Sequence, residues 1–282
     1  MINFVPFFVI LCIEVYIMKI TALVENISHT DLKPIHGLSL FIETKHHNIL
    51  FDLGPDSTLF ENAEKLNIDL RMIDVVFISH GHYDHGGALK RFLDINNTAK
   101  IYVQRKAFEK HYNKISLFKI SVGIDQHLEN HPQVILVDGD LKIDDELTLF
   151  VVSNISKCRS IENDHLYTKE GKDNFLHEQN LIINENTTAL IMGCGHAGLI
   201  NILEKAKEVN PHICVGGYHL AYPATKKQIN YPLLDQIILE LENYPNIEFY
   251  TCHCTGIKSY EYLASKLDCM HYLSCGETYR FD

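Results

Sequence analysis

The feature that most constrains this chain is a cluster of metal-ligand residue types directly after an apolar stretch. Residues 74–78 (DVVFI) are typical of a buried strand, and the chain continues as SHGHYDHGG over 79–87. A loop leaving the strand can turn His80 and His82 toward one cation, while Asp84 and His85 enter the next helix and face a second. The glycines of the segment let the backbone turn tightly around the ions. We therefore predict metal ligands at His80, His82, Asp84 and His85.

Two later strand ends offer the remaining ligands. Residues 188–200 (TALIMGCGHAGLI) place His196 between a strand and a helix, and 247–256 (IEFYTCHCTG) place His253 at another strand end. We predict that His196 joins His80 and His82 on one ion, and that His253 joins Asp84 and His85 on the other. An alternative for His253 is a separate small thiolate site with its two neighbouring cysteines.

Composition excludes several other classes of protein. The 282 residues are 46% hydrophobic, which is too apolar for general disorder, and the formal net charge of −11 argues against a nucleic-acid partner. The chain holds 17 histidines, which favours metal chemistry. Its eight cysteines form no CxxC pair and no short disulfide framework, so we expect a reducing, cytoplasmic compartment.

Alternating strand and helix patterns predict two sheets sandwiched between helices in one domain over 18–282. The strands are expected at 19–25, 38–43, 48–52, 74–78, 100–103, 133–137, 147–152, 180–184, 188–192, 212–216 and 247–250. The helices are expected at 57–66, 85–94, 104–113, 198–208, 226–243 and 257–267. The weakly patterned segment 104–180 is interpreted as an insertion or lid over the site. Residues 1–17 are apolar but interrupted by Pro6 and Glu14, so we expect an upstream extension or surface tail rather than a membrane anchor.

The order of these motifs resembles the metallo-β-lactamase superfamily. Within it, the chain resembles the branch named for 7,8-dihydropterin-6-ylmethyl-4-(β-D-ribofuranosyl)aminobenzene 5′-phosphate synthase, a step in methanopterin assembly. The segments that carry this resemblance are HGLSLFIE (36–43), FDLG (51–54), HEQNLII (177–183), GCGHAGLINIL (193–203), GGYHL (216–220) and HCTG (253–256).

The resemblance implies an α/β fold, the four-layer αβ/βα sandwich, with a dinuclear metal centre between the sheets. It also implies that Asp52 is a carboxylate that orients the metal loop, although a turn or helix-capping role is an equal alternative from the residues alone. One position departs from the family pattern. The strand ending VGGYHL lacks the usual bridging Asp, and His219 is the nearest candidate, as a ligand, a substrate hydrogen-bonding group or a general acid.

The expected function is a metal-dependent hydrolase or transferase acting on a small molecule, with a phosphorylated or pterin-diphosphate compound as one candidate substrate. Asp84 and His219 are the catalytic candidates, and His36, His177 and Glu178 are candidates for the pocket wall. One or two divalent ions are expected, zinc first, with iron or manganese as alternatives. The rival functions are an iron-bound redox protein and a non-catalytic metal sensor. No membrane partner is expected, and a homo-oligomer is compatible with the sequence.

Overall fold

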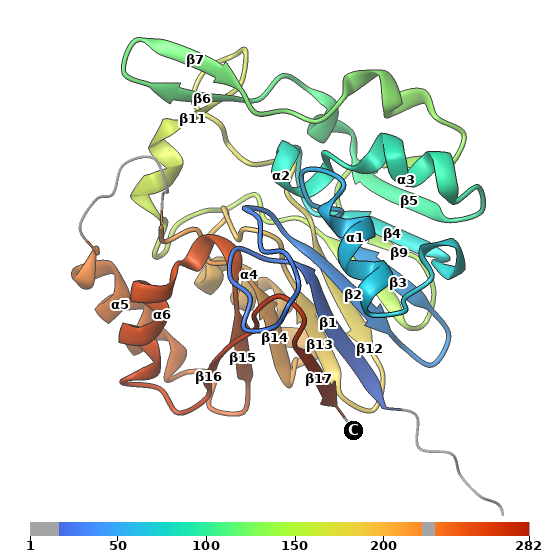
Figure 1. Cartoon of the computed structure of the whole chain (residues 1–282). Coiled ribbons are helices and arrows are strands. Elements are labelled where there is room, and N and C mark those ends of the chain that lie inside the picture. Colours follow the sequence, from blue (N-terminus) through green and yellow to red (C-terminus); the bar gives the residue numbers. More distant parts are fainter. Residues whose placement is uncertain (1–16, 222–228, 282) are drawn as a thin grey trace, which may run out of the picture.

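The computed structural model describes residues 17–221 and 229–281, and its centre is a pair of seven-stranded sheets (Figure 1). The first sheet has the order β17 (Thr278–Phe281), β1 (Met18–Val24), β2 (Ser39–Glu43), β3 (Asn48–Phe51), β4 (Val75–Ile78), β5 (Lys100–Gln104) and β8 (Val134–Val137). The second sheet has the order β16 (Met270–Tyr272), β15 (Glu248–Thr251), β14 (Ile213–Gly216), β13 (Thr188–Ile191), β12 (Asn180–Asn184), β10 (Leu147–Phe150) and β9 (Leu141–Lys142). In each sheet, antiparallel pairing gives way to parallel pairing near the middle, from β3 to β8 and from β13 to β16.

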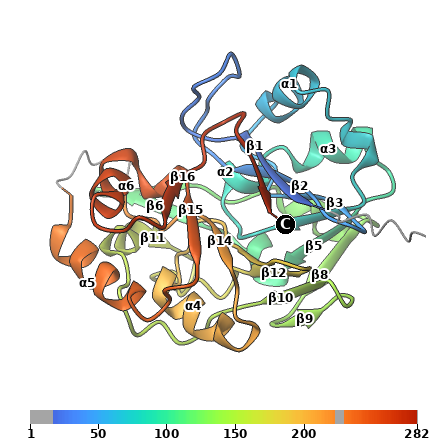
Figure 2. The same cartoon turned by 90° about the horizontal axis from the view of Figure 1, so that it is seen from below.

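Helices cover the outer face of each sheet (Figures 1 and 2). On the first sheet lie α1 (Thr58–Lys65), α2 (Tyr83–Gly86) and α3 (Leu89–Ile95), and on the second lie α4 (Leu199–Ala206), α5 (Tyr231–Leu241) and α6 (Ile257–Ala264). Short 3₁₀ turns occur at η1 (Leu70–Met72), η2 (Arg105–Phe108), η3 (Gln126–Asn130), η4 (Ile161–His165), η5 (Lys207–Val209) and η6 (His253–Thr255). The result is the four-layer sandwich that the family resemblance implies.

The strand sequences explain why both faces of each sheet are covered. In β4, Val75 and Phe77 enter the core between the sheets, while Val76 and Ile78 enter the core under α1 and α3. In β13, Ala189 and Ile191 point between the sheets in the same way, and Leu190 points toward α4. Because successive side chains of a strand alternate, an unbroken apolar run can bury both faces.

The segment 104–180 contains two different kinds of structure. The strands β6 (Tyr112–Ile115), β7 (Phe118–Ser121) and β11 (Leu166–Tyr167) form a small sheet outside the sandwich (Figure 1). In contrast, β8, β9 and β10 join the two main sheets. The helix predicted over 104–113 is wrong, because only the turn η2 and then β6 occur there. Cross-strand pairing of β6 with β7 through a two-residue turn decides this region in place of local helix periodicity.

The predicted N-terminal extension over 1–17 lies outside the described residues, apart from Ile17. Among the residues that are described, no helix combines the length and the apolar character needed to cross a bilayer.

Candidate metal centre

The predicted ligands lie at one edge of the sandwich, where parallel strands from both sheets end. His80 and His82 follow β4, His196 follows β13, and His253 follows β15. A cavity of about 500 Å³ opens here and is lined by His82, Asp84, His196 and His253 among others. Ligand sites commonly form at the carboxyl ends of parallel strands, because the loops that leave the strands meet there.

The first predicted ligand set is brought together from both sheets. His80 Nε2 lies 3.4 Å from His196 Nε2. The ring centroid of His82 lies 4.6 Å from that of His80 and 5.1 Å from that of His196. All three side chains are buried.

The second set converges beside the first. His85 Nε2 lies 3.2 Å from His253 Nε2, and Asp84 Oδ2 lies 3.5 Å from the same nitrogen. The rings of His80 and His85 are 4.1 Å apart, so the two sets share a boundary. Residues separated by up to 173 positions (253 − 80) in the chain thus meet at one place.

Four of the five imidazoles have their outer ring nitrogen held by a neighbouring oxygen atom. The pairs are His80 Nδ1 with Ser79 Oγ (2.8 Å), His85 Nδ1 with Asp52 Oδ2 (2.6 Å), His196 Nδ1 with Asn163 Oδ1 (2.8 Å) and His253 Nδ1 with Asn26 Oδ1 (2.9 Å). Such contacts fix the tautomer and ring orientation, so that the inner nitrogen presents its lone pair.

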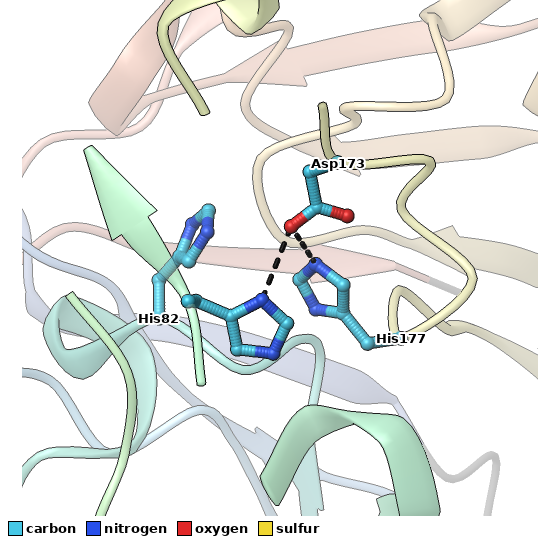
Figure 3. Close-up of side chains that lie close together, drawn as sticks. His82, Asp173 and His177 are labelled. Atoms are coloured by element: carbon cyan, nitrogen blue, oxygen red, sulfur yellow. Dashed lines mark hydrogen bonds and ion pairs between the residues drawn. The ribbon is translucent and has the colours of Figure 1, made fainter. Parts of the chain in front are cut away.

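His82 is the exception among the five. Its Nε2 is buried and has no hydrogen-bond partner within residues 17–221 and 229–281. A ring nitrogen of His82 lies within 4.8 Å of the nearest ligand-type atoms of His111, Asp173 and His177 (Figure 3).

These three neighbours form a hydrogen-bonded brace behind the metal loop. His177 Nδ1 accepts the Gly81 N–H at 2.9 Å, so its Nε2 carries the proton donated to Asp173 Oδ2 at 3.2 Å. His111 Nδ1 lies 3.1 Å from the same carboxylate oxygen. Burial opposes ionisation of Asp173, but the neighbouring His177 and the hydrogen bonds from both imidazoles hold its pKa well below the usual range.

The protonation of the clustered imidazoles depends on which charges surround them. Burial, and then repulsion from neighbouring imidazoles, lower the pKa values of His80, His82 and His196 well below the ordinary value. These rings are therefore neutral, which is the form that binds metals. Burial also opposes charge on His85, but Asp52 and Asp84 outweigh it and raise the pKa of His85 to about 9.

Asp52 occupies the position behind the loop that the family resemblance implies for an orienting carboxylate. It follows β3 with a left-handed φ of 64°, and its carboxylate accepts from the backbone N–H and the hydroxyl of Ser79 as well as from His85. The carboxylate is fully buried, so these three donors replace water.

His219 follows β14, where the family pattern would have a bridging Asp. Its ring lies 4.2 Å from that of His196, and its backbone N–H faces Cys254 Sγ at 3.2 Å. Both ring nitrogens are buried without a partner among the described residues, and the side chain lines the cavity. The ring is thus available to a ligand or an ion.

The three predicted pocket-wall residues lie in different places. His36 lines the cavity, with Nε2 3.3 Å from Asp84 Oδ2. His177 belongs to the brace, and Glu178 lies behind His196, where its carboxylate accepts the backbone N–H groups of His196 and Ala197 at 2.7 and 2.8 Å. Burial outweighs these hydrogen bonds and raises the pKa of Glu178 to about 7.

Sequence reasoning missed Cys194 at the centre and considered Cys254 only as part of a separate thiolate site beside His253. Cys194 Sγ lies 3.2 Å from His85 Nε2, and ligand atoms of Cys194, His219 and Cys254 lie within 4.8 Å of one another. Burial opposes ionisation of Cys254, but its neighbours Cys194, His219 and His253 lower its pKa well below the ordinary value. The only signal in the sequence was that each cysteine neighbours a predicted ligand motif.

A family model for the metallo-β-lactamase superfamily matches residues 32–155, which include the whole His80–His85 motif. Over this part of its length, the chain is similar to the metallo-β-lactamase superfamily. This similarity to a superfamily of metal-dependent hydrolases supports enzyme activity and binding of divalent metals.

The similarity to individual proteins extends over most of the chain. A Methanocaldococcus jannaschii protein, described only as uncharacterized protein MJ0448, is 29% identical over 249 residues, covering 85% of this chain and 91% of that protein. A protein of the same organism named 7,8-dihydropterin-6-methyl-4-(β-D-ribofuranosyl)-aminobenzene-5′-phosphate synthase is 24% identical, covering 79% of this chain and 82% of the relative.

Among solved structures, Tm1679, described as a metal-dependent hydrolase of the β-lactamase superfamily, superposes with a TM-score of 0.76. It is 24% identical, and the match covers 93% of this chain and 98% of Tm1679. This similarity establishes a shared fold along nearly the whole of both chains.

Proposed function

We propose that this protein is a metal-dependent hydrolase or transferase that binds one or two divalent ions at the centre described above. His80, His82 and His196 would hold one ion, and Asp84, His85 and His253 the other. The single observation that carries the proposal is the convergence of these six buried side chains from both sheets. For the first ion, the pKa directions support the proposal as well, because His80, His82 and His196 are neutral.

The donor set fits a borderline divalent ion. Imidazole nitrogens and one carboxylate are typical ligands of zinc, and the same donors accept iron or manganese. When bound, such an ion lowers the pKa of a coordinated water from about 15.7 toward 7 and stabilises negative charge on a leaving group. We place zinc first because tetrahedral nitrogen-rich sites suit it.

Two residues of the chain are proposed to handle protons and substrate. Asp84 lies between His36 and His253 and opens to the cavity, so its carboxylate can accept a proton from an attacking nucleophile. His219 has two ring nitrogens without protein partners beside His196, so it can donate a hydrogen bond or a proton to a substrate oxygen. His36 is proposed as a substrate-contacting residue on the cavity wall.

The proposed substrate is a small molecule, because the cavity of about 500 Å³ is of the size that holds one. Because one relative is named as a dihydropterin synthase, the first candidate substrate is a phosphorylated or pterin-diphosphate compound. Transfer to a second substrate, in place of hydrolysis, would follow if that substrate entered where water otherwise attacks.

The test measures metal content and turnover together. Protein purified without chelator is analysed for zinc, iron and manganese and screened with phosphodiesters, lactones and pterin diphosphates. We expect at least one ion per chain, and loss of both metal and turnover in the His82→Ala/Asp84→Ala double variant, with the circular dichroism spectrum retained.

A matched control is His29→Ala, since His29 is exposed and is not a predicted ligand. It should keep full metal content. Unchanged turnover in the double variant would refute the ligand assignment, and a stoichiometric redox-active iron with no hydrolysis or transfer would favour the redox alternative.

A further inference from the structure

The β6–β7 hairpin has two faces of different chemistry. Its register pairs Ile115 with Phe118 and Asn113 with Ile120. Because side chains alternate across a strand, these four residues share one face of the hairpin. That face is therefore mainly apolar.

The opposite face is basic and already has partners within the protein. Lys114 and Lys119 are paired across the hairpin. Lys119 Nζ lies 5.0 Å from the centroid of the Tyr167 ring and 5.7 Å from that of Tyr112, and Lys114 Nζ lies 5.6 Å from the Tyr167 ring. Because β11 pairs edge to edge with β6, with Tyr167 opposite Tyr112 and Leu166 opposite Asn113, Tyr167 lies on the basic face and Leu166 on the apolar face.

The apolar face borders the metal centre. Ile115 and Ile120 line the same cavity as His82, His196 and His253, and Leu166 of β11 completes this wall. The two isoleucines nevertheless keep 43% and 52% of their surface exposed. One side of the cavity thus offers ligand-type imidazoles, and the other offers apolar side chains that are still in contact with water.

An unpartnered polar atom lies at the base of the same wall. Asn113 lines the cavity, and its Oδ1 is buried without a hydrogen-bond partner among the described residues. A buried acceptor without a donor costs free energy unless a ligand supplies one. This atom is an independent sign that a bound molecule belongs against this wall.

We propose that the wall formed by Ile115, Ile120 and Leu166 binds an alkyl or aryl portion of the substrate, while the polar end of the substrate lies at the imidazoles. The placement of the polar end rests on the proposed function. The apolar contact does not, because it depends only on the cavity wall.

The test uses straight-chain carboxylates, namely acetate, butyrate, hexanoate and octanoate, titrated calorimetrically into zinc-loaded protein. Each carboxylate can bind at the imidazoles, and its alkyl chain can extend along the wall. Burial of a methylene strengthens binding by up to about fourfold, so the Kd should fall about two- to fourfold for each added methylene.

In the Ile115→Asn/Ile120→Asn double variant, the Kd should depend much less on chain length. The Kd for acetate should stay within about twofold of the wild-type value. Leu117→Asn is the matched control, since Leu117 lies in the same hairpin at 89% exposure and does not line the cavity. It should keep the wild-type slope. A wild-type series without chain-length dependence, or equal slopes in wild type and double variant, would overturn the apolar subsite.

The same titrations on EDTA-treated protein separate the two proposals. Removal of metal should raise the Kd of every carboxylate by a common factor. The ratio of Kd values between successive chain lengths should stay unchanged. Equal affinities with and without zinc would count against the metal centre. A Kd that does not change with chain length in either sample would count against the apolar subsite.

Discussion

At the scale of single residues, the centre depends on side chains that hold the ligands from behind. Four of the five imidazoles have an oxygen on their outer nitrogen, and Asp52 holds both His85 and the Ser79 turn. His82 alone lacks such a partner, and the Asp173 carboxylate lies close to it (Figure 3). A ligand that binds metal through one nitrogen leaves the other nitrogen protonated, and a nearby carboxylate stabilises that proton.

This arrangement predicts the effect of Asp173→Asn. The amide removes the negative charge behind His82 and weakens the brace through His177 to Gly81, so the affinity for zinc should fall by about 10- to 100-fold. Competition with a chromophoric chelator measures the affinity. Asp164→Asn is the control, because Asp164 lies at the surface, where it forms ion pairs with Arg159 and Lys172. Wild-type affinity in Asp173→Asn would show that the carboxylate does not serve the centre.

At the scale of elements, α4 fixes the His196 loop against the second sheet. Leu199, Ile202, Leu203 and Ala206 recur at helical spacing and are buried in the core under this helix. The helix begins directly after Gly198, two residues beyond His196. Packing of the helix and position of the ligand are therefore coupled through a very short stretch of backbone.

Truncation of Leu203 tests this packing. Leu203 is 1% exposed, so Leu203→Ala should lower the free energy of unfolding by about 2–5 kcal/mol in urea titrations. Leu239→Ala on α5 should change it by less than about 0.5 kcal/mol, since Leu239 is 63% exposed. Equal effects of the two substitutions would contradict the burial described for α4.

The elements also show what the sequence can and cannot predict. Long apolar runs such as β4 and β13 were recognised because both of their faces are buried, and the helix at α4 was recognised from its periodicity. The strands β6 and β7 were missed because they are short, exposed and stabilised by pairing with each other. The same limit applies to the site: the spacing of His80 to His85 predicts a cluster, but the approach of Cys194 and of the Asp173 brace depends on loops that no local pattern specifies.

At the scale of the whole molecule, the two sheets are joined away from the metal centre by His47. Its Nδ1 lies 2.6 Å from Asp74 Oδ2, before β4 of the first sheet, and its Nε2 lies 3.1 Å from Asp144 Oδ2, between β9 and β10 of the second. Burial lowers the pKa of His47, but the hydrogen bond to Asp74 and the charges of Asp74, Glu146 and Asp144 outweigh burial and raise it.

The raised pKa gives the His47 contact a definite pH dependence. Its contribution to stability is fully present below about pH 6.5, the usual pKa, and is lost as the pH rises through the higher value of the folded state. His47→Gln should therefore lower the free energy of unfolding by about 1 kcal/mol at pH 6, with a smaller effect at pH 9. The neighbouring, exposed His46→Gln should have little effect at either pH. An effect of His47→Gln that grows with pH would reverse the assigned sign.

The hairpin beside the cavity has a consequence for how this protein can diversify. Its strands lie outside both main sheets, so substitutions in the hairpin leave the core between the sheets and the proposed ligand side chains unchanged. Substitutions at Ile115 and Ile120 can therefore change substrate specificity with little effect on folding. In directed evolution toward new substrates, we expect substitutions to accumulate in the β6–β7 hairpin before they occur at the histidines of the centre.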